Sequence, residues 1–198
     1  DMFGYVYADL NEADGNGNLI SRGMIKSYSD HQKTNIKQML SRDMFILPSA
    51  TLISKKCLLE VGGFDQQFMG YEDDDLFIRI FRAGFSSIYI DQPVTVWCIN
   101  SDSTSYSLKM IVSKYLFIDK LLTVFPDDQA RNFSYATACI YPRFLRANVL
   151  EIIKLKLNNP VGYEKINPLF ESFITKYCDN RTVNIKERIK FKCVALAI

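Results

Sequence analysis

Four consecutive acidic residues at positions 72–75 are the group in this chain best suited to chemistry. They open a stretch with the apolar spacing of a helix. On a helical wheel Asp73 falls on the same stripe as Leu76, three residues later, whereas Asp75 falls on the opposite face and reaches Arg79 at i, i+4. An inward carboxylate must be hydrogen-bonded, metal-bound or functional, because an unpaired buried charge is costly. Asp73 is therefore the residue for which a chemical role has to be considered.

A structural explanation of the same acids is available. Acidic side chains in the first turn complement the helix dipole, each contributing roughly 0.3–1 kcal/mol, so such clusters also occur without any chemistry. For an isolated acidic cluster this explanation would be preferred. Here it competes with a longer pattern around the cluster.

The longer pattern runs from residue 49 to the end of the acidic helix. It comprises residues 49–56, the turn Gly62-Gly63-Phe64-Asp65, the helix start Glu72-Asp73 and the glycine at 84. In this order it closely resembles the acceptor-side half of family-2 glycosyltransferases of the GT-A fold, and residues 70–79 are similar to the corresponding segment of β-1,4-galactosyltransferases. The resemblance covers residues 4–107. Its specificity lies in the ordered set, since a Glu-Asp pair alone is not diagnostic.

The resemblance assigns roles to five residues. Asp73 matches the catalytic base of the family, Glu72 and Asp74 match positions near the acceptor sugar, and Gly70 and Tyr71 match the loop that shapes the acceptor pocket. A base that takes the proton of an attacking hydroxyl typically contributes about 10²–10⁴ in rate. The transition state would be oxocarbenium-like, as in glycoside hydrolysis. A single inward base is consistent with an inverting transfer.

The resemblance also indicates what this chain lacks. Family members begin with a nucleotide-binding half, in which an Asp-x-Asp motif at a strand end holds a metal. The strand expected at residues 3–9 resembles the segment just after that motif, so we expect a fragment without the N-terminal nucleotide-binding half. A divalent metal, Mn or Mg, is then expected in the full-length enzyme, with its main ligands outside this chain. Asp73-Asp74-Asp75 matches Asp-x-Asp literally, but it opens a helix instead of following a buried strand, and we assign no metal ligand.

A second departure from the family lies at residues 95–100. Many relatives carry an aromatic-Arg-x-His motif there, and the His sometimes helps to hold the metal. This chain has Trp97, Cys98 and Asn100 in the aromatic, Arg and His positions. No metal contribution is therefore assigned to this strand. The polar residues 101–105 predict a loop, and a solvated loop is favoured over one that folds over substrates.

The pattern of elements indicates a mixed α/β fold. We expect a partial GT-A-like sheet with flanking helices at 1–107, followed by an α-helical region at 108–198 whose preferred role is a scaffold. In the first region the expected strands are 4–10, 45–53, 87–90 and 94–97, with a hairpin turn at 14–17 and helices at 33–41, 55–60 and from the acids to Gly84. In the second region helical spacing covers 108–124, 127–156 and 165–178.

Composition limits the other classes of function. The net charge of +2 and the absence of a Lys/Arg run give no support for nucleic-acid binding. The five cysteines are scattered and there is a single histidine, which excludes zinc spacing and favours free thiols in a reducing compartment. We expect a cytoplasmic protein. The apolar residues 194–198 either pack as a short helix or begin a membrane-associated segment at the inner face of a membrane. A truncated sheet edge favours pairing into a homo-oligomer.

Two functions remain open from the sequence. The favoured one is transfer of a sugar from a nucleotide-sugar donor to a hydroxyl of a glycan or glycoconjugate acceptor, in polysaccharide or glycoconjugate synthesis. This chain alone is not expected to bind the donor well. The alternative is a non-catalytic module that binds glycan or a partner protein with the same fold.

Overall fold

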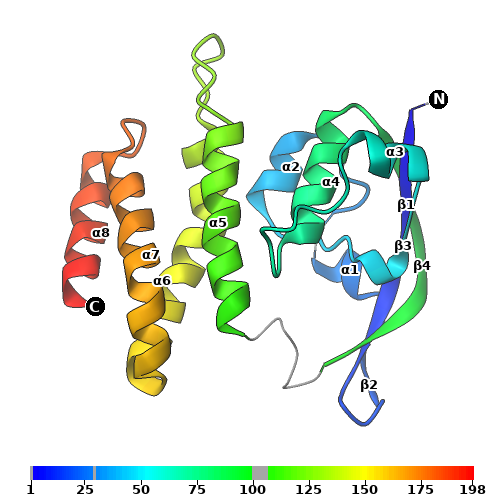
Figure 1. Ribbon diagram of the computed structural model, residues 1–198, viewed down its shortest axis with the longest axis horizontal. Helices are drawn as coiled ribbons and strands as arrows, with labels where there is room; N and C mark the ends of the chain where they lie inside the picture. The colour runs from blue at the N-terminus through cyan, green and yellow to red at the C-terminus, as the bar shows by residue number, and fades with distance from the viewer. Residues whose placement is uncertain (1, 29, 100–106) are drawn as a thin grey trace. The chain divides into compact units, whose positions relative to one another are not determined.

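A computed structural model describes residues 2–28, 30–99 and 107–198, and the chain divides into two compact units, Asp1–Met110 and Ile111–Ile198. The fold is mixed α/β, with one open mixed sheet and flanking helices (Figure 1). This confirms the predicted fold class. Asn100 and the polar residues 101–105 lie outside the described residues. The assignment of the first unit as an acceptor-side half stays a prediction.

The sheet is built around one long strand, β1 (Phe3–Ala13). β4 (Ser86–Cys98) runs parallel to it along one edge. On the other edge β3 (Thr51–Ile53) and β2 (Leu19–Ser21) pair antiparallel with opposite ends of β1. The predicted turn between β1 and β2 is confirmed, and Gly17 there has a φ of +84°, which favours glycine. β1 is therefore the strand with which the other three strands of the described sheet pair.

Two predicted strand assignments are wrong. Residues 45–53 form a strand only at Thr51–Ile53, because Pro48, which has no N–H to donate to a sheet, begins a 3-10 turn (Pro48–Ala50). Residues 87–90 and 94–97 belong to one continuous strand, β4. The interruption expected at Pro93 is present only as an irregular register opposite Asp9.

Four helices belong to the first unit. α3 (Lys55–Glu60) and α4 (Glu72–Arg82) confirm the predicted helices. α2 (Ile36–Ser41) is shorter than predicted, because Asn35 caps it in a capping box with Gln38. α1 (Met24–Tyr28) was not predicted. Helices α1, α2 and α4 lie on the same side of the sheet (Figure 1).

The core of the unit joins α4 to β1. Leu76, Phe77 and Ile80 of α4 are buried, as the predicted apolar stripe requires. The rings of Phe77 and Tyr5 lie 4.7 Å apart between centroids, in a tilted arrangement that aromatic pairs favour. Tyr5 and Tyr7, both on β1, are themselves buried. This packing fixes the face that α4 turns toward the sheet.

Asp9, in the middle of β1, organises the start of α1. Its carboxylate accepts the backbone N–H of Leu10 at 2.7 Å, of Ile25 at 2.8 Å and of Lys26 at 3.3 Å, and the hydroxyl of Tyr89 at 2.9 Å. Burial alone would raise the pKa of Asp9, but these hydrogen bonds outweigh it and hold the pKa below its usual value. A buried carboxylate thus joins β1, α1 and β4.

Arg79 ties α4 to the turn at residues 61–63, as Asp9 ties β1 to α1. Its Nε donates to Asp75 at 2.8 Å, and its two other nitrogens donate to the carbonyls of Val61 at 2.6 Å and Gly63 at 2.7 Å. The predicted pair is confirmed, but the prediction that Asp75 lies at the surface is wrong, because Asp75 is only 3% exposed. The turn at Gly62 and Gly63, both with positive φ, brings Val61 and Gly63 to this face of α4.

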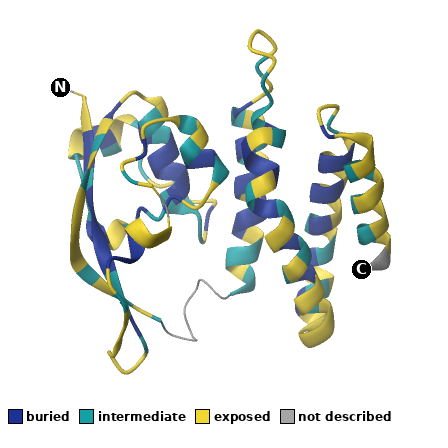
Figure 2. Cartoon of the chain, turned by 180° about the vertical axis from the view of Figure 1, so that it is seen from behind, coloured by how far each residue is buried: buried dark blue, intermediate teal, exposed yellow. Residues whose placement is uncertain are grey.

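The second unit is helical, as predicted, with different boundaries. α5 (Leu108–Val124), whose first residues belong to the first unit, matches the prediction. A π-helical turn (Ala136–Ile140) leads into α6 (Tyr141–Asn158), so the helix predicted at 127–156 begins late. α7 (Pro160–Asp179) begins early, because Asn159 caps it and a proline fits its first position. α8 (Ile185–Ala197) ends the chain. Buried residues gather on the faces that these helices share (Figure 2).

We predict that Arg79→Gln lowers the free energy of unfolding by roughly 3 kcal/mol, because it removes the guanidinium that neutralises the buried Asp75 carboxylate. Urea denaturation followed by the fluorescence of Trp97, the single tryptophan, reports the first unit directly. Lys55→Gln, at an exposed position, is the control and should change little. The double variant Asp75→Asn/Arg79→Gln should lose less than the two single losses added together; strict additivity would contradict the pairing.

Candidate functional site

The start of α4 is set by an unusual backbone turn. Gly70 has a φ of +152°, and Tyr71, the residue before the helix, is left-handed with a φ of +65°. A Cβ added at Gly70 would collide with Sδ of Met110. A left-handed non-glycine residue costs free energy and is retained only when its surroundings impose it. The turn therefore places the Tyr71 side chain and the first acids of α4 in a defined position.

A cavity of about 210 Å³ opens at this helix start, within the first unit. One part of its wall is aromatic and another part is acidic. The aromatic residues are Phe45, Tyr71 and Trp97, and the acidic residues are Asp43, Asp73 and Asp74. Aromatic surface beside carboxylates is suited to a ligand with an apolar face and hydroxyl groups.

Asp73 is an acid of this wall whose pKa is strongly altered. Its Oδ1 accepts the backbone N–H of Asp74 at 2.8 Å, and the residue is partly buried. Burial, together with the negative charges of Asp74 and Glu72, raises the pKa of Asp73 from 3.8 to about 7, against the lowering by backbone hydrogen bonds. A carboxyl group with a pKa near neutrality can accept a proton and release it again at the working pH.

The structure brings only some of the predicted site residues to the cavity. Tyr71, Asp73 and Asp74 line it. Gly70 and Glu72 do not line it, although they adjoin these residues in the chain, and Gly70 packs against Met110. Oε2 of Glu72 is buried without a hydrogen-bond partner within the described part of the chain. The roles of all five residues stay predictions, since geometry alone assigns none of them.

The sequence reasoning missed a large part of the cavity wall. Phe45 lies in the segment 45–53 that was predicted as a strand, and Asp43 lies just before it, so no motif marked either residue. Phe45 is held by Tyr28, whose ring stacks on it with centroids 4.9 Å apart and an interplanar angle of 22°. Trp97 was noted only as the aromatic residue of an altered motif. The signal that could have found Phe45 was Pro48, which argues against a strand.

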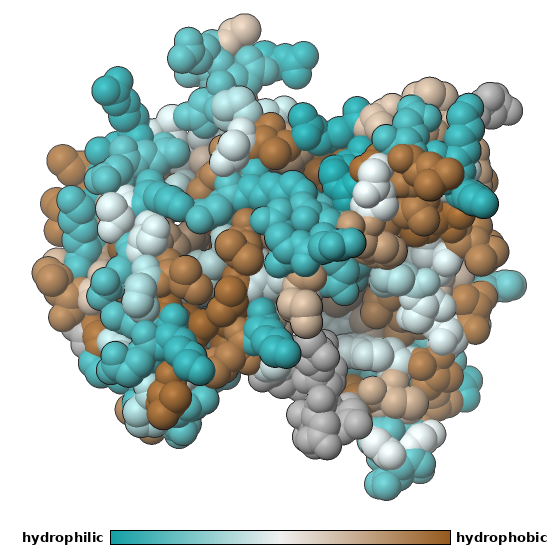
Figure 3. Space-filling view, viewed as in Figure 1, coloured by the Kyte–Doolittle hydropathy of each residue, from teal (hydrophilic) through white to brown (hydrophobic). Residues whose placement is uncertain are grey.

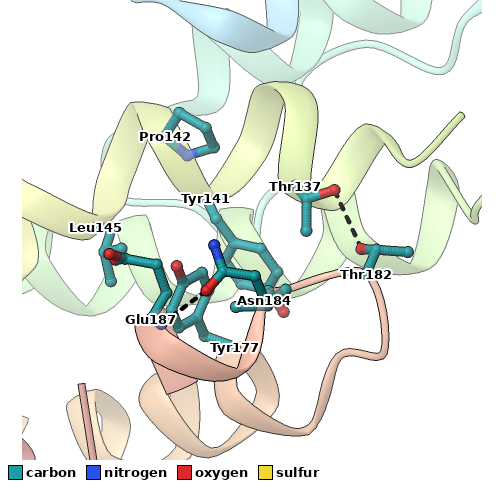
Figure 4. A pocket seen from close by; sticks show the side chains of 9 residues that line it. Thr137, Tyr141, Pro142, Leu145, Tyr177, Thr182, Asn184 and Glu187 are labelled. Carbon is teal, nitrogen blue, oxygen red and sulfur yellow. Dashed lines mark hydrogen bonds between the residues drawn. The ribbon is translucent and has the colours of Figure 1, made fainter. Parts of the chain in front are cut away.

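A second hollow, of about 230 Å³, lies within the helical unit between α6, α7 and the start of α8 (Figure 4). Tyr141 and Tyr177 form part of its wall. Two pairs of its polar groups are bonded within the unit: the hydroxyls of Thr182 and Thr137 are 3.1 Å apart, and the Asn184 side chain accepts the N–H of Glu187 at 3.0 Å. It offers no ionisable group with the acidity of Asp73, so the first cavity is the candidate active site.

Among the described residues there is neither a cluster suited to a metal ion nor a helix able to cross a bilayer. In residues 2–28, 30–99 and 107–198 no three His, Cys, Asp or Glu side chains come together as a metal site. Among the helices that the structure describes, none has the length and apolar character needed to cross a bilayer.

Comparison with protein families gives a match over the first unit. The family described as glycosyltransferase like family 2 matches residues 4–95, which include β1 from its second residue, the Gly62-Gly63 turn and the whole of α4. No curated protein matches the chain. The matched segment carries Asp73, Asp74 and Tyr71 of the cavity wall, and the activity associated with it is glycosyl transfer. Residues 4–95 are therefore similar to the glycosyltransferase-like family 2, and the match is consistent with a partial domain of that kind.

Proposed function

We propose that Asp73 is the general base of an inverting transfer of a sugar from a nucleotide-sugar donor to a hydroxyl of a glycan or glycoconjugate acceptor, in polysaccharide or glycoconjugate synthesis. One observation carries the proposal. A partly buried carboxyl with a pKa of about 7 lies on the wall of a cavity, inside the segment matched by a glycosyltransferase family. An acid with this pKa can accept a proton near neutral pH.

The chemistry balances around this carboxylate. The acceptor oxygen forms a bond to the anomeric carbon of the donor sugar while its proton passes to a carboxylate oxygen of Asp73. The bond between the anomeric carbon and the nucleoside diphosphate breaks, and the diphosphate leaves with the electron pair. The proton on Asp73 is then released to solvent, which a pKa of about 7 permits.

The surrounding residues support this step in different ways. Asp74 raises the pKa of Asp73 by its negative charge. Tyr71 and Trp97 offer aromatic surface for the apolar face of the acceptor sugar. Glu72 and Asp74 are proposed to lie near the acceptor hydroxyls, and Gly70 and Tyr71 to shape the acceptor pocket. A cavity of about 210 Å³ is smaller than the roughly 300–1,000 Å³ of sites for drug-sized ligands, which suits one sugar residue.

The charge of the leaving diphosphate needs a counter-charge that this cavity does not offer. A divalent ion such as Mn or Mg would stabilise that charge. The described residues do not fit such an ion, because they contain no cluster of three suitable side chains. We therefore propose that the metal and its main ligands lie outside this chain.

Replacing Asp73 tests its role as the base. Asp73→Asn in the complete protein should lower kcat by roughly 10²-fold or more, because the acceptor loses its base, while the KM for the donor changes little. Released nucleotide measures the rate, and Asp91→Asn, an exposed acid on β4, is the control. Retained turnover in Asp73→Asn would remove this residue from the mechanism. A non-catalytic binding module would show no donor turnover in the unaltered protein and unchanged glycan binding in the variant.

The pH dependence of kcat/KM tests the raised pKa of Asp73. Because the ionised carboxylate is the base, kcat/KM should rise with pH and level off above about 7. Asp74→Asn removes a negative charge that raises the pKa of Asp73, so the midpoint of this rise should move to lower pH, whatever happens to the maximal rate. An unchanged midpoint in Asp74→Asn, or a midpoint near 4 in the unaltered protein, would contradict the proposal.

The stability of Asp73→Asn relative to the unaltered chain should depend on pH. The pKa of Asp73 is higher in the folded chain than its ordinary value of 3.8, so its favourable contribution is complete below about pH 4 and is lost as pH rises through about 7. Asp73→Asn should therefore be more stable than the unaltered chain at pH 8, by an amount on the order of 1–3 kcal/mol, and equally stable at pH 4. Urea denaturation at the two pH values measures the difference. A variant that is less stable at pH 8 would show that the carboxylate is held by favourable contacts.

A further inference from the structure

The cavity at the start of α4 has acids on its wall and no bases. Asp43, Asp73 and Asp74 are among the residues that line it. No lysine, arginine or histidine belongs to the lining that the structure describes. Residues 1, 29 and 100–106, which lie outside the described part of the chain, include none of these basic types either. Within this chain the wall of the cavity is therefore negatively charged.

Basic residues of the neighbouring segments are placed elsewhere in the first unit. Arg42, the residue before Asp43, lines a different hollow. Arg79, on α4, donates to Asp75 at 2.8 Å, and Nζ of Lys26, on α1, lies 2.8 Å from a carboxylate of β4. A ligand held by the described wall of the cavity therefore has acids beside it and no base.

The aromatic part of the wall sets the shape of the ligand. Phe45 and Tyr71 both have left-handed backbones, with φ of +52° and +65°, and such strain is retained only where the surroundings impose it. Trp97 adds a third ring, and the apolar face of a sugar suits such a surface. Hydropathy alone does not set this wall apart, since hydrophilic and hydrophobic side chains are mixed over the face of the first unit that Figure 3 shows. The sign of its charge does.

Charge decides which sugar such a wall accepts. A charged group placed against groups of the same sign costs binding free energy, and the cost grows where water is displaced. The chain already shows the effect, because the negative charges of Asp74 and Glu72 contribute to the raised pKa of Asp73. A carboxylate or phosphate group on the acceptor would add a further negative charge. A protonated amino group would instead be attracted.

We infer that the acceptor sugar of this cavity carries no negative charge, and that a sugar with a protonated amino group binds in preference to its neutral counterpart. The inference rests on the proposed sugar transfer and deepens it, because it names the class of the acceptor. Asp43 makes the distinction. It is exposed and lies outside α4, so its charge acts on a bound sugar while the proposed proton transfer is left to Asp73.

Binding of simple sugars to the 198-residue chain tests the inference without any donor. Trp97 is the single tryptophan and lines the cavity, so its fluorescence reports a bound sugar. Glucose, glucosamine and glucuronic acid share one ring, and at about pH 7 they are neutral, mostly positive and negative, respectively. We expect the dissociation constant to rise from the amino sugar to the neutral sugar and then to the uronate, by on the order of 10-fold in total. High salt should reduce this spread. Galactose, galactosamine and galacturonic acid repeat the series with one hydroxyl in the other orientation.

Substitutions at Asp43 test the origin of the preference. The ratio of the dissociation constants of the uronate and the amino sugar should fall by roughly threefold in Asp43→Asn and by roughly tenfold in Asp43→Lys, because the first removes a negative charge and the second reverses it. Asp91→Asn removes an exposed acid of the same unit that is not part of the described cavity lining, so it is the matched control and should leave the ratio unchanged. Because position 43 is exposed, its variants should keep the urea midpoint of the unaltered chain.

The possible failures can be told apart. Uronates that bind as tightly as amino sugars, or a ratio that Asp43→Lys leaves unchanged, would overturn the inference alone, and the effect of Asp73→Asn on kcat would still support the proposed transfer. If Trp97 responds to none of the six sugars, the acceptor pocket of the proposed function is contradicted, and the inference falls with it.

Discussion

The guanidinium of Arg79 is the interaction on which the candidate active site depends. It neutralises the buried carboxylate of Asp75 and at the same time ties α4 to the carbonyls of Val61 and Gly63. Without this cation the charge of the buried Asp75 carboxylate would not be neutralised, which costs several kcal/mol. The raised pKa of Asp73 comes mainly from burial, and the negative charges of Asp74 and Glu72 add to it. The pairing thus separates an acid that supports the structure from an acid with altered acidity.

Two opposing effects act on Asp73 at the start of α4. The helix dipole favours a negative charge there by roughly 0.3–1 kcal/mol, which lowers the pKa. Burial and the neighbouring acids act in the opposite direction and raise the pKa from 3.8 to about 7. At about 1.4 kcal/mol per pKa unit, this rise requires more than the dipole can offset. The acidic helix start is therefore not explained by dipole complementarity alone, because at this position it makes the ionised form less stable.

The sequence predicted the local features of this site and failed on the long-range ones. The helix α4, its pair Asp75–Arg79 and the turn after β1 were predicted, because i, i+4 spacing and glycine positions are local signals. The burial of Asp75 was not predictable, since it requires a turn at 61–63 to fold back onto the helix. Asp43 and Phe45 reach the cavity from an irregular segment, and Asp9 caps a helix 16 residues away. Such contacts have no periodic signature in the chain.

The size of the cavity limits what binding alone can achieve at this site. A hollow of about 210 Å³ offers contacts to one sugar residue, and a ligand of that size gains limited affinity from such contacts. On the proposed function, the aromatic and acidic wall would therefore act chiefly by orienting the acceptor hydroxyl toward Asp73, because a general base requires its substrate to be correctly placed within hydrogen-bond reach.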